Sequence, residues 1–204
     1  MRMRFIIFIL LLILSRSSGA WAQDRHFEII PFIGFRAGGT FQDAVQEETL
    51  KVDESTAYGL TIDVDYDATG QVQLLWSHQT SEFKTLTVTD SSFDLNIDYF
   101  HFGGTYSWAK DDTFLPYVAV SLGATHLQPV DSGYNDEWRF SMGLGLGFKY
   151  FFTPRIGVLL EGRAYGTFMG GSGAIFCGSG GCQIAIHQEL FGQFEGRTGI
   201  VFRF

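Results

Sequence analysis

The sequence is poor in cysteine, proline and positive charge. Its 204 residues include two Cys, four Pro and 14 Lys or Arg, against 22 Asp or Glu. A formal net charge of −8 argues against nucleic acid as a partner, because phosphate backbones are bound mainly by Lys and Arg. Beyond the first 14 residues the sequence also lacks an apolar run of helix length, an amphipathic helix, an internal repeat and a linker. These absences argue against a helical membrane protein and favour a single domain.

The N-terminal segment has the pattern of a secretory signal peptide. Arg2 and Arg4 precede an unbroken apolar run at 5–14, and the tripeptide Ala-Trp-Ala at 20–22 is a small-x-small cleavage site. The run is too short for a membrane anchor, because a helix that spans a bilayer needs about 20 apolar residues. We therefore expect cleavage after residue 22. The remaining domain, 23–204, then has 14 − 3 = 11 basic residues against 22 acidic ones.

Glycine and aromatic residues are abundant: the chain has 25 Gly, and 16% of its residues are Phe, Trp or Tyr. Both kinds of residue suit twisted strands. Strand-like runs separated by turn segments predict an all-β fold of eight strands. The predicted strands are 27–37, 56–66, 71–79, 93–108, 114–127, 136–152, 156–168 and a last strand that follows a glycine-rich loop and ends at 204. Their connections alternate between long and short, with short turns near 67–70, 109–113 and 153–155.

The alternation of side chains separates two kinds of barrel. A soluble lipocalin-like barrel turns its apolar face inward, whereas a membrane barrel turns that face to lipid and has a polar lumen. In 136–152, seven large apolar residues alternate with a face that carries Gly143, Gly145, Gly147 and two cations. Small and charged residues suit the narrow lumen of eight strands. We therefore predict an eight-stranded antiparallel up-and-down transmembrane β-barrel, with the soluble barrel as the alternative.

Two local patterns add detail to this prediction. Tyr58, Tyr66, Trp138 and Tyr150 lie near predicted strand ends, where the aromatic girdles of membrane barrels are found. At 99–102, Tyr-Phe-His-Phe, both faces of a strand become aromatic. This predicts a β-bulge that switches the register there.

The last six residues, Gly-Ile-Val-Phe-Arg-Phe, place Ile200, Phe202 and Phe204 on one face of a strand. With the signal peptide and the eight alternating strands, the mature chain resembles the small OmpA/OmpX-like outer-membrane β-barrels of Gram-negative bacteria over its whole length. The resemblance implies a bacterial outer-membrane location, with lipid and lipopolysaccharide around the barrel. It also implies that the three residues form an assembly signal read by the barrel-assembly machinery during biogenesis. Such barrels include adhesins, scaffolds, lipid A enzymes and channels for apolar solutes, so the individual function stays open.

Charged residues gather on the face predicted to line the lumen. They are Glu28 and Arg36 on the first strand, and Glu161, Arg163, Glu195, Arg197 and Arg203, with Gln193, on the last two. In so narrow a space charges must pair, because removing one partner of a buried pair costs about 3–5 kcal/mol. We interpret the set as lumen ion pairs that form a structural plug. The alternative is a path for a substrate or an ion. Counting from the periplasmic rim predicts that Arg197 faces Glu161 across adjacent strands.

Cys177 and Cys182 lie in the last long loop and enclose four small residues. Export favours oxidation, so we predict a disulfide between them. Free thiols are one alternative, and a metal site is another, although His187 is the only further ligand nearby.

An enzyme of the outer rim would need a histidine with a serine and a carboxylate. His126 with Asp131 and Ser132 is the candidate, but it resembles the lipid A deacylases poorly, because those enzymes place the serine two residues after the histidine, where this chain has Gln128. We predict no catalytic residue, cofactor or metal site. The predicted function is that of a non-enzymatic barrel acting in envelope integrity or surface interaction through its extracellular loops, with an unidentified surface ligand. A channel for small or apolar solutes and a lipid A-modifying enzyme are the alternatives.

Overall fold

The structure is a computed structural model. It describes residues 26–38, 40–42, 49–84, 92–108, 113–130, 135–170, 173–178, 181–186 and 190–204. All regular structure in these ranges is β-strand. Among the described residues there is no helix of the length and apolar character needed to cross a membrane. The predicted signal peptide lies outside the described residues.

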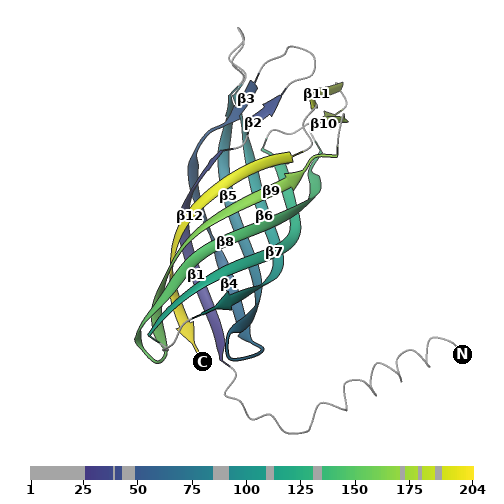
Figure 1. The fold of residues 1–204 in the computed structure, drawn as a ribbon. Helices are drawn as coiled ribbons and strands as arrows, with labels where there is room; N and C mark the ends of the chain where they lie inside the picture. The colour runs from purple at the N-terminus through teal and green to yellow at the C-terminus, as the bar shows by residue number, and fades with distance from the viewer. Residues whose placement is uncertain are drawn as a thin grey trace, which may run out of the picture.

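Eight strands close into an antiparallel barrel (Figure 1), which confirms the predicted fold class. Each strand pairs with the next, β12 pairs with β1, and the β5–β6 pairing completes the ring. The eight strands are β1 (Phe27–Gly38), β4 (Ser55–Asp65), β5 (Gly70–Lys84), β6 (Ser92–Ser107), β7 (Phe114–Pro129), β8 (Glu137–Thr153), β9 (Ile156–Phe168) and β12 (Leu190–Arg203). Closure leaves the wall without a free edge, which is the condition for a sheet to span lipid.

The long connections contain four short strands, in segments that the sequence pattern assigns to loops. They are β2 (Thr40–Gln42), β3 (Thr49–Val52), β10 (Gly173–Gly178) and β11 (Gly181–Ile186). Through β3, the β2–β3 hairpin continues the barrel sheet, because Lys51 pairs with Lys84 of β5. The β10–β11 hairpin forms a sheet of its own. In Figure 1 all four lie at one end of the barrel, and the chain end Phe204 lies at the other.

The end with the short turns corresponds to the periplasmic side of an outer-membrane barrel, where turns are short. The turn after β4 is closed by Asp67, whose Oδ1 accepts hydrogen bonds from the backbone N–H of Thr69 at 2.8 Å and of Gly70 at 2.7 Å. These bonds, that of Thr69 first, favour the carboxylate and lower the pKa of Asp67. In an outer-membrane barrel the opposite end, with the long connections, is the extracellular one.

Outward-facing side chains form an apolar band around the barrel. On β8, Trp138, Leu144 and Tyr150 are 59%, 62% and 40% exposed, whereas Ser141 and Lys149 alternate with them and are buried in the lumen. Trp138 and Tyr150 are 150 − 138 = 12 residues apart. At about 3.3 Å per residue and a tilt of about 45°, this separation corresponds to roughly 28 Å of height. The band thus has the height of a bilayer core, with an aromatic residue at each edge.

The predicted bulge at 99–102 is wrong. The register of β6 with β5 and with β7 runs without interruption through this segment. Tyr99 and His101 point into the lumen and are buried, whereas Phe100 and Phe102 point outward. Both faces of β6 are aromatic here because the rings of Tyr99 and His101 form hydrogen bonds inside the barrel. A register shift occurs elsewhere in the wall, between β8 and β9 at 151–153.

Towards its extracellular end the lumen contains a group of buried apolar side chains, beside the buried polar residues Gln79 and Ser81, whereas the sequence predicts a polar lumen. Leu95 and Ile97 of β6, Leu127 of β7 and Phe191 of β12 are all 0% exposed and lie on the inward faces of their strands. On β6 the polar side chains that alternate with them therefore face outward. Along this strand, apolar side chains face inward and polar ones outward only on the extracellular side of Tyr99, beyond the apolar outer band.

Candidate functional site

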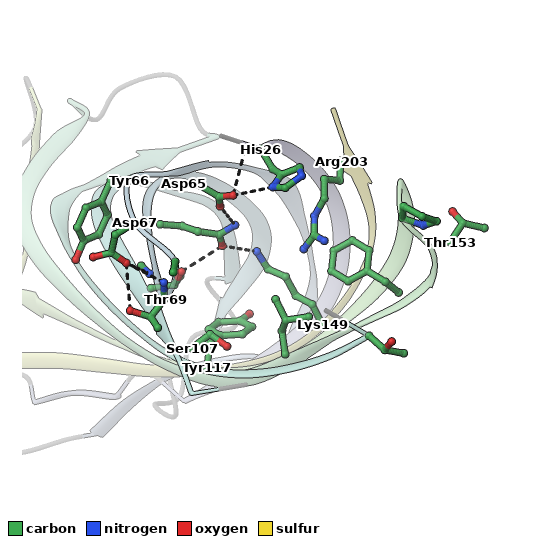
Figure 2. Close-up of a pocket in the computed structure, with 18 of the residues that line it drawn as sticks. His26, Asp65, Tyr66, Asp67, Thr69, Ser107, Tyr117, Lys149, Thr153 and Arg203 are labelled. Atoms are coloured by element: carbon green, nitrogen blue, oxygen red, sulfur yellow. Dashed lines mark hydrogen bonds and ion pairs between the residues drawn. The ribbon is translucent and has the colours of Figure 1, made fainter. Parts of the chain in front are cut away.

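The candidate site is the lumen, which opens at the periplasmic end into a vestibule of about 570 Å³. Figure 2 shows its residues, with His26 and Asp65 at the rim and Lys149 reaching into its centre. His26 Nδ1 lies 3.1 Å from Asp65 Oδ2. Tyr117 and Lys149 line the inner end. Both polar and apolar side chains line the vestibule, which lies at the end with the short turns.

Lys149 holds together the first of three charged layers. Its Nζ donates to Glu28 Oε2 at 2.5 Å, to Asp63 Oδ2 at 2.7 Å and to Gln71 Oε1 at 2.8 Å. Arg203 Nε donates to the other oxygen of Glu28 at 2.9 Å. Two cations thus balance two carboxylates. The sequence pattern singles out Glu28 and Arg203 as lumen charges, but it gives no partner for Lys149 or Asp63.

A hydrophobic collar adjoins this layer. It is formed by the buried side chains of Ile30, Tyr117, Ala119, Phe151, Leu159 and Val201. These side chains come from β1, β12, β9, β8 and β7, which are consecutive strands of the wall, so the collar lines one side of the lumen. Close apolar packing on this side leaves little room for water beside the charged layers.

The middle layer is built on Glu161, which two arginines share. Arg163 Nε donates to Glu161 Oε1 at 2.5 Å, and Arg197 Nη2 lies 2.9 Å from the same oxygen. Arg197 and Glu161 are direct register partners across β12 and β9, as the residue count predicts. Tyr117 donates its hydroxyl to Glu161 Oε2. A single carboxylate therefore interacts with two guanidinium groups and one hydroxyl, and the layer carries one excess positive charge.

Arg197 interacts with its neighbours without directional hydrogen bonds. Its side chain is fully buried, yet none of its three guanidinium nitrogens has a hydrogen-bond partner among the described residues. The guanidinium lies over the Phe32 ring, 4.4 Å from the centroid. Cation–π and Coulomb attraction therefore hold Arg197 in place.

Glycine makes room for this layer. A Cβ at Gly145 would lie 2.9 Å from Glu161 Oε1 and 3.2 Å from Arg163 Nε. A Cβ at Gly147 would lie within 3 Å of the Glu161 backbone. Gly145 and Gly147, two of the three alternating glycines of β8 that indicate a narrow lumen in the sequence, are thus the positions against which the central ion pair packs.

Arg36 organises the third layer. Its Nε donates to Glu195 Oε2 at 2.8 Å, and its Nη2 contacts both Glu195 and Ser77. The guanidinium also lies 4.8 Å from the centroid of the Tyr99 ring, which stacks on Tyr165 at 4.1 Å. Tyr99 then donates to Gln193 Oε1 at 2.8 Å. An ion pair, two stacked rings and an amide together fill this cross-section.

Sequence reasoning missed His101 as a member of the lumen network. Its two ring nitrogens lie 2.9 Å from Ser121 Oγ and 2.9 Å from Ser141 Oγ. Arg163 Nη1 also approaches Ser121 Oγ, at 3.4 Å. If side chains had been assumed to alternate between lumen and outer face without a break through 99–102, the sequence would have placed His101 in the lumen. A buried imidazole between two hydroxyls and close to arginines cross-links three strands.

The candidate catalytic group is not assembled by the described residues. His126 lies on the outer face, where its ring stacks on Trp138 at 4.4 Å and its Nε2 is 3.3 Å from Asp136 Oδ2. Asp131 and Ser132 lie outside the described residues. No group of three potential metal ligands occurs in the part of the chain that the structure describes.

The two cysteines lie in the β10–β11 hairpin. The backbone register places Cys177 directly opposite Cys182. The predicted disulfide stays a prediction, as does the assembly signal at 200–204. At that end of β12, Phe204 exchanges backbone hydrogen bonds with Phe27, at 2.9 and 3.2 Å.

Comparison with known proteins identifies the family. A family model of the outer membrane protein beta-barrel domain matches residues 8–175. No curated protein sequence is a significant match. Among solved structures, outer membrane protein AlkL in lipid bilayers is 13% identical with a TM-score of 0.58, over 92% of this chain and 93% of that one.

Two further structures have the same fold. Neisserial surface protein A is 9% identical with a TM-score of 0.57, over 88% of this chain and 97% of that one. OprG from Pseudomonas aeruginosa is 14% identical with a TM-score of 0.57, over 88% of this chain and 95% of that one. Identities this low establish the fold alone. The family model covers most of the sequence, and on that ground the chain belongs to the outer membrane protein beta-barrel domain family of the bacterial outer membrane.

Proposed function

We propose that the protein is a non-enzymatic outer-membrane barrel whose lumen is a structural plug and whose function, in envelope integrity or surface interaction, lies in its extracellular connections. The observation that carries the proposal is the filling of the lumen. Arg36, Glu161, Arg163, Glu195 and Arg197 are each at most 2% exposed and interact with one another or with neighbouring lumen side chains. A lumen occupied in this way supports the wall and leaves the extracellular end to meet other molecules.

The length of the extracellular strands supports the same proposal. The β5–β6 hairpin is paired as far as Lys84 opposite Ser92. Lys84 is 84 − 76 = 8 residues beyond the outer aromatic residue Trp76. At about 3.3 Å per residue, this part of the hairpin is roughly 26 Å long. A substantial part of the chain therefore stands outside the bilayer.

Complementation of a deletion strain tests the proposal. One variant replaces 173–186 by a short Gly-Ser turn, and the matched control replaces the buried pair Arg36 and Glu195 by Met together. Exchange of a whole buried ion pair for apolar residues is often neutral for stability. We expect the loop variant to fold, as judged by its shifted gel migration, but to lose resistance to detergents and large antibiotics. The control should retain this resistance. Full resistance with the loop variant and loss with the control would contradict the proposal.

A second candidate, passage of small apolar solutes, is favoured by the buried apolar side chains near the extracellular end of the lumen. Leu95, Ile97 and Leu127 would accept an apolar molecule more readily than the charged layers below them. Uptake of an apolar dye into vesicles containing the protein separates the candidates. A plug predicts the same rate as empty vesicles, and Leu95→Arg should then change nothing. Protein-dependent uptake that Leu95→Arg abolishes would favour the passage.

A further inference from the structure

The outer wall of the barrel carries an apolar groove of about 410 Å³ between β4 and β7. Leu60 of β4, Leu74 and Trp76 of β5, Phe102 of β6 and Leu122 of β7 contribute outward-facing side chains to it, whereas Gly123 faces the lumen and contributes backbone. The volume is within the range of small-molecule sites, about 300–1,000 Å³. The groove lies in the upper part of the apolar band, so lipid chains are what it meets.

Asp98 stands directly above the groove, on the outer face of β6. Its Oδ1 accepts a hydrogen bond from the indole Nε1 of Trp76 at 3.1 Å and lies 2.9 Å from His78 Nδ1. Its side chain is 15% exposed. Among the described residues no hydrogen bond to Oδ2 is present, so this oxygen can accept a donor from outside the protein.

The surroundings of Asp98 are aromatic and acidic. Phe100, another groove residue, stacks on Trp138 at 5.8 Å, and Trp138 stacks in turn on His126, the register neighbour of Asp98. Asp136 lies 3.3 Å from His126. An anionic head group would meet two carboxylates here. A head group that donates hydroxyl hydrogen bonds and presents an apolar ring face to the aromatic side chains would be complementary.

We propose that this groove binds one acyl chain of a glycolipid of the outer leaflet, with a sugar hydroxyl of its head group donating to Asp98 Oδ2. The site names a lipid chemistry that the proposed function does not assign, and it stands independently of that function. Leu122 and Leu74 set the width for the chain, and Trp76 joins the apolar groove to the polar rim. The bound lipid would be held in one orientation against β5 and β6.

The indole N–H of Trp76 provides the measurement, because it lies between the groove and Asp98. The ¹⁵N-labelled protein is placed in phosphatidylcholine nanodiscs, and its indole signals are followed while dodecyl maltoside is added to a few mole per cent. We expect a saturable shift of the Trp76 signal. Dodecyl sulfate carries the same chain with an anionic head that has no hydrogen-bond donor, and it should require at least about ten times more ligand.

Two variants have matched controls. Leu122→Trp fills the groove and should weaken maltoside binding by at least about tenfold, whereas Leu144→Trp, on the lipid-facing side of β8, should leave it unchanged. Asp98→Asn should remove the preference for maltoside over sulfate. Shifts that rise linearly for both amphiphiles would overturn the site. Equal affinity for dodecyl sulfate, or an equal effect of the two Trp variants, would overturn the proposal as well.

Discussion

At the scale of single residues, we expect Glu161 to contribute more to the free energy of unfolding than either Arg163 or Arg197, the two arginines that it pairs with. Glu161 balances both Arg163 and Arg197, whereas loss of Arg197 would leave Glu161 paired with Arg163 at 2.5 Å. We expect Glu161→Gln to lower the free energy of unfolding by about 3–5 kcal/mol, because two buried guanidiniums lose their counter-charge. Arg197→Met should cost clearly less, since Arg197 makes no hydrogen bond with the described residues. Urea unfolding in lipid vesicles gives both values, and the reverse order of cost would contradict this reading of the layer.

The turn residue Asp67 predicts a pH dependence. Hydrogen bonds from the backbone, that of Thr69 first, lower its pKa in the folded state. A lowered pKa contributes stability that is complete above the unfolded value, about 3.9, and is lost as the pH falls through the folded value. The difference in unfolding free energy between wild type and Asp67→Ala should therefore shrink as the pH is lowered below about 4. A difference that stays constant from pH 7 to pH 2 would show that the carboxylate charge has no part in the turn.

Sequence reasoning could place single residues on the lumen face but could not assign most of their partners. Alternation along a strand fixes the face, so Arg36 and Glu195 could be recognised as inward-facing. Partners on distant strands depend on the tilt and shear of the whole barrel, which no local pattern encodes. Lys149 and Asp63, 86 positions apart, meet for this reason only in the folded barrel.

At the scale of elements, the β10–β11 hairpin gives a test of the cysteines. Its register places Cys177 opposite Cys182, which suits a cross-strand disulfide. Closing so short a loop should add less than the ~3 kcal/mol expected for a 15-residue loop. The Cys177→Ser, Cys182→Ser double variant should therefore have nearly unchanged barrel stability. Intact, unreduced cells should show no alkylation of either thiol, and labelling of both would exclude the bridge.

The end of β12 gives a test of the assembly signal. Phe204 is 70% exposed and contacts Phe27, with ring centroids 6.3 Å apart, so its packing is slight. We expect Phe204→Ser to lower barrel yield in cells far more than refolding from urea into detergent, because only the cellular route needs recognition. Val201→Ser, at a fully buried position of the same strand, is the control and should impair both routes. Equal losses for Phe204→Ser in the two assays would leave packing as its only role.

The strand β6 shows where pattern reasoning fails at this scale. If the lumen is assumed to be polar along its full length, aromatic residues on both faces of a strand indicate a register switch. The structure instead continues the alternation and places apolar side chains such as Leu95 and Ile97 in the lumen near its extracellular end. Above the bilayer the outer face meets water, so the rule that relates polarity to direction no longer holds there.

At the scale of the whole molecule, the fold could be predicted because a membrane barrel repeats one simple pattern. Eight alternating segments and unequal connections are visible in the sequence, and the structure bears out both. The order of charged layers, apolar collar and outer apolar side chains along the lumen could not be predicted, because it arises when eight strands are closed at one particular shear. The four short strands outside the barrel wall were missed because their segments lack a clear alternating pattern.

Filling of the lumen is the central claim about the whole molecule, and current through single barrels in planar bilayers measures it most directly. Three layers of paired charges and an apolar collar predict negligible conductance for the wild-type protein. The double variant Glu161→Gly, Arg163→Gly, which empties the middle layer, should increase brief leak events if it still folds. Steady, large single-channel currents from the wild-type protein would contradict the sealed lumen and would make Glu161, Arg163 and Arg197 residues of ion selectivity.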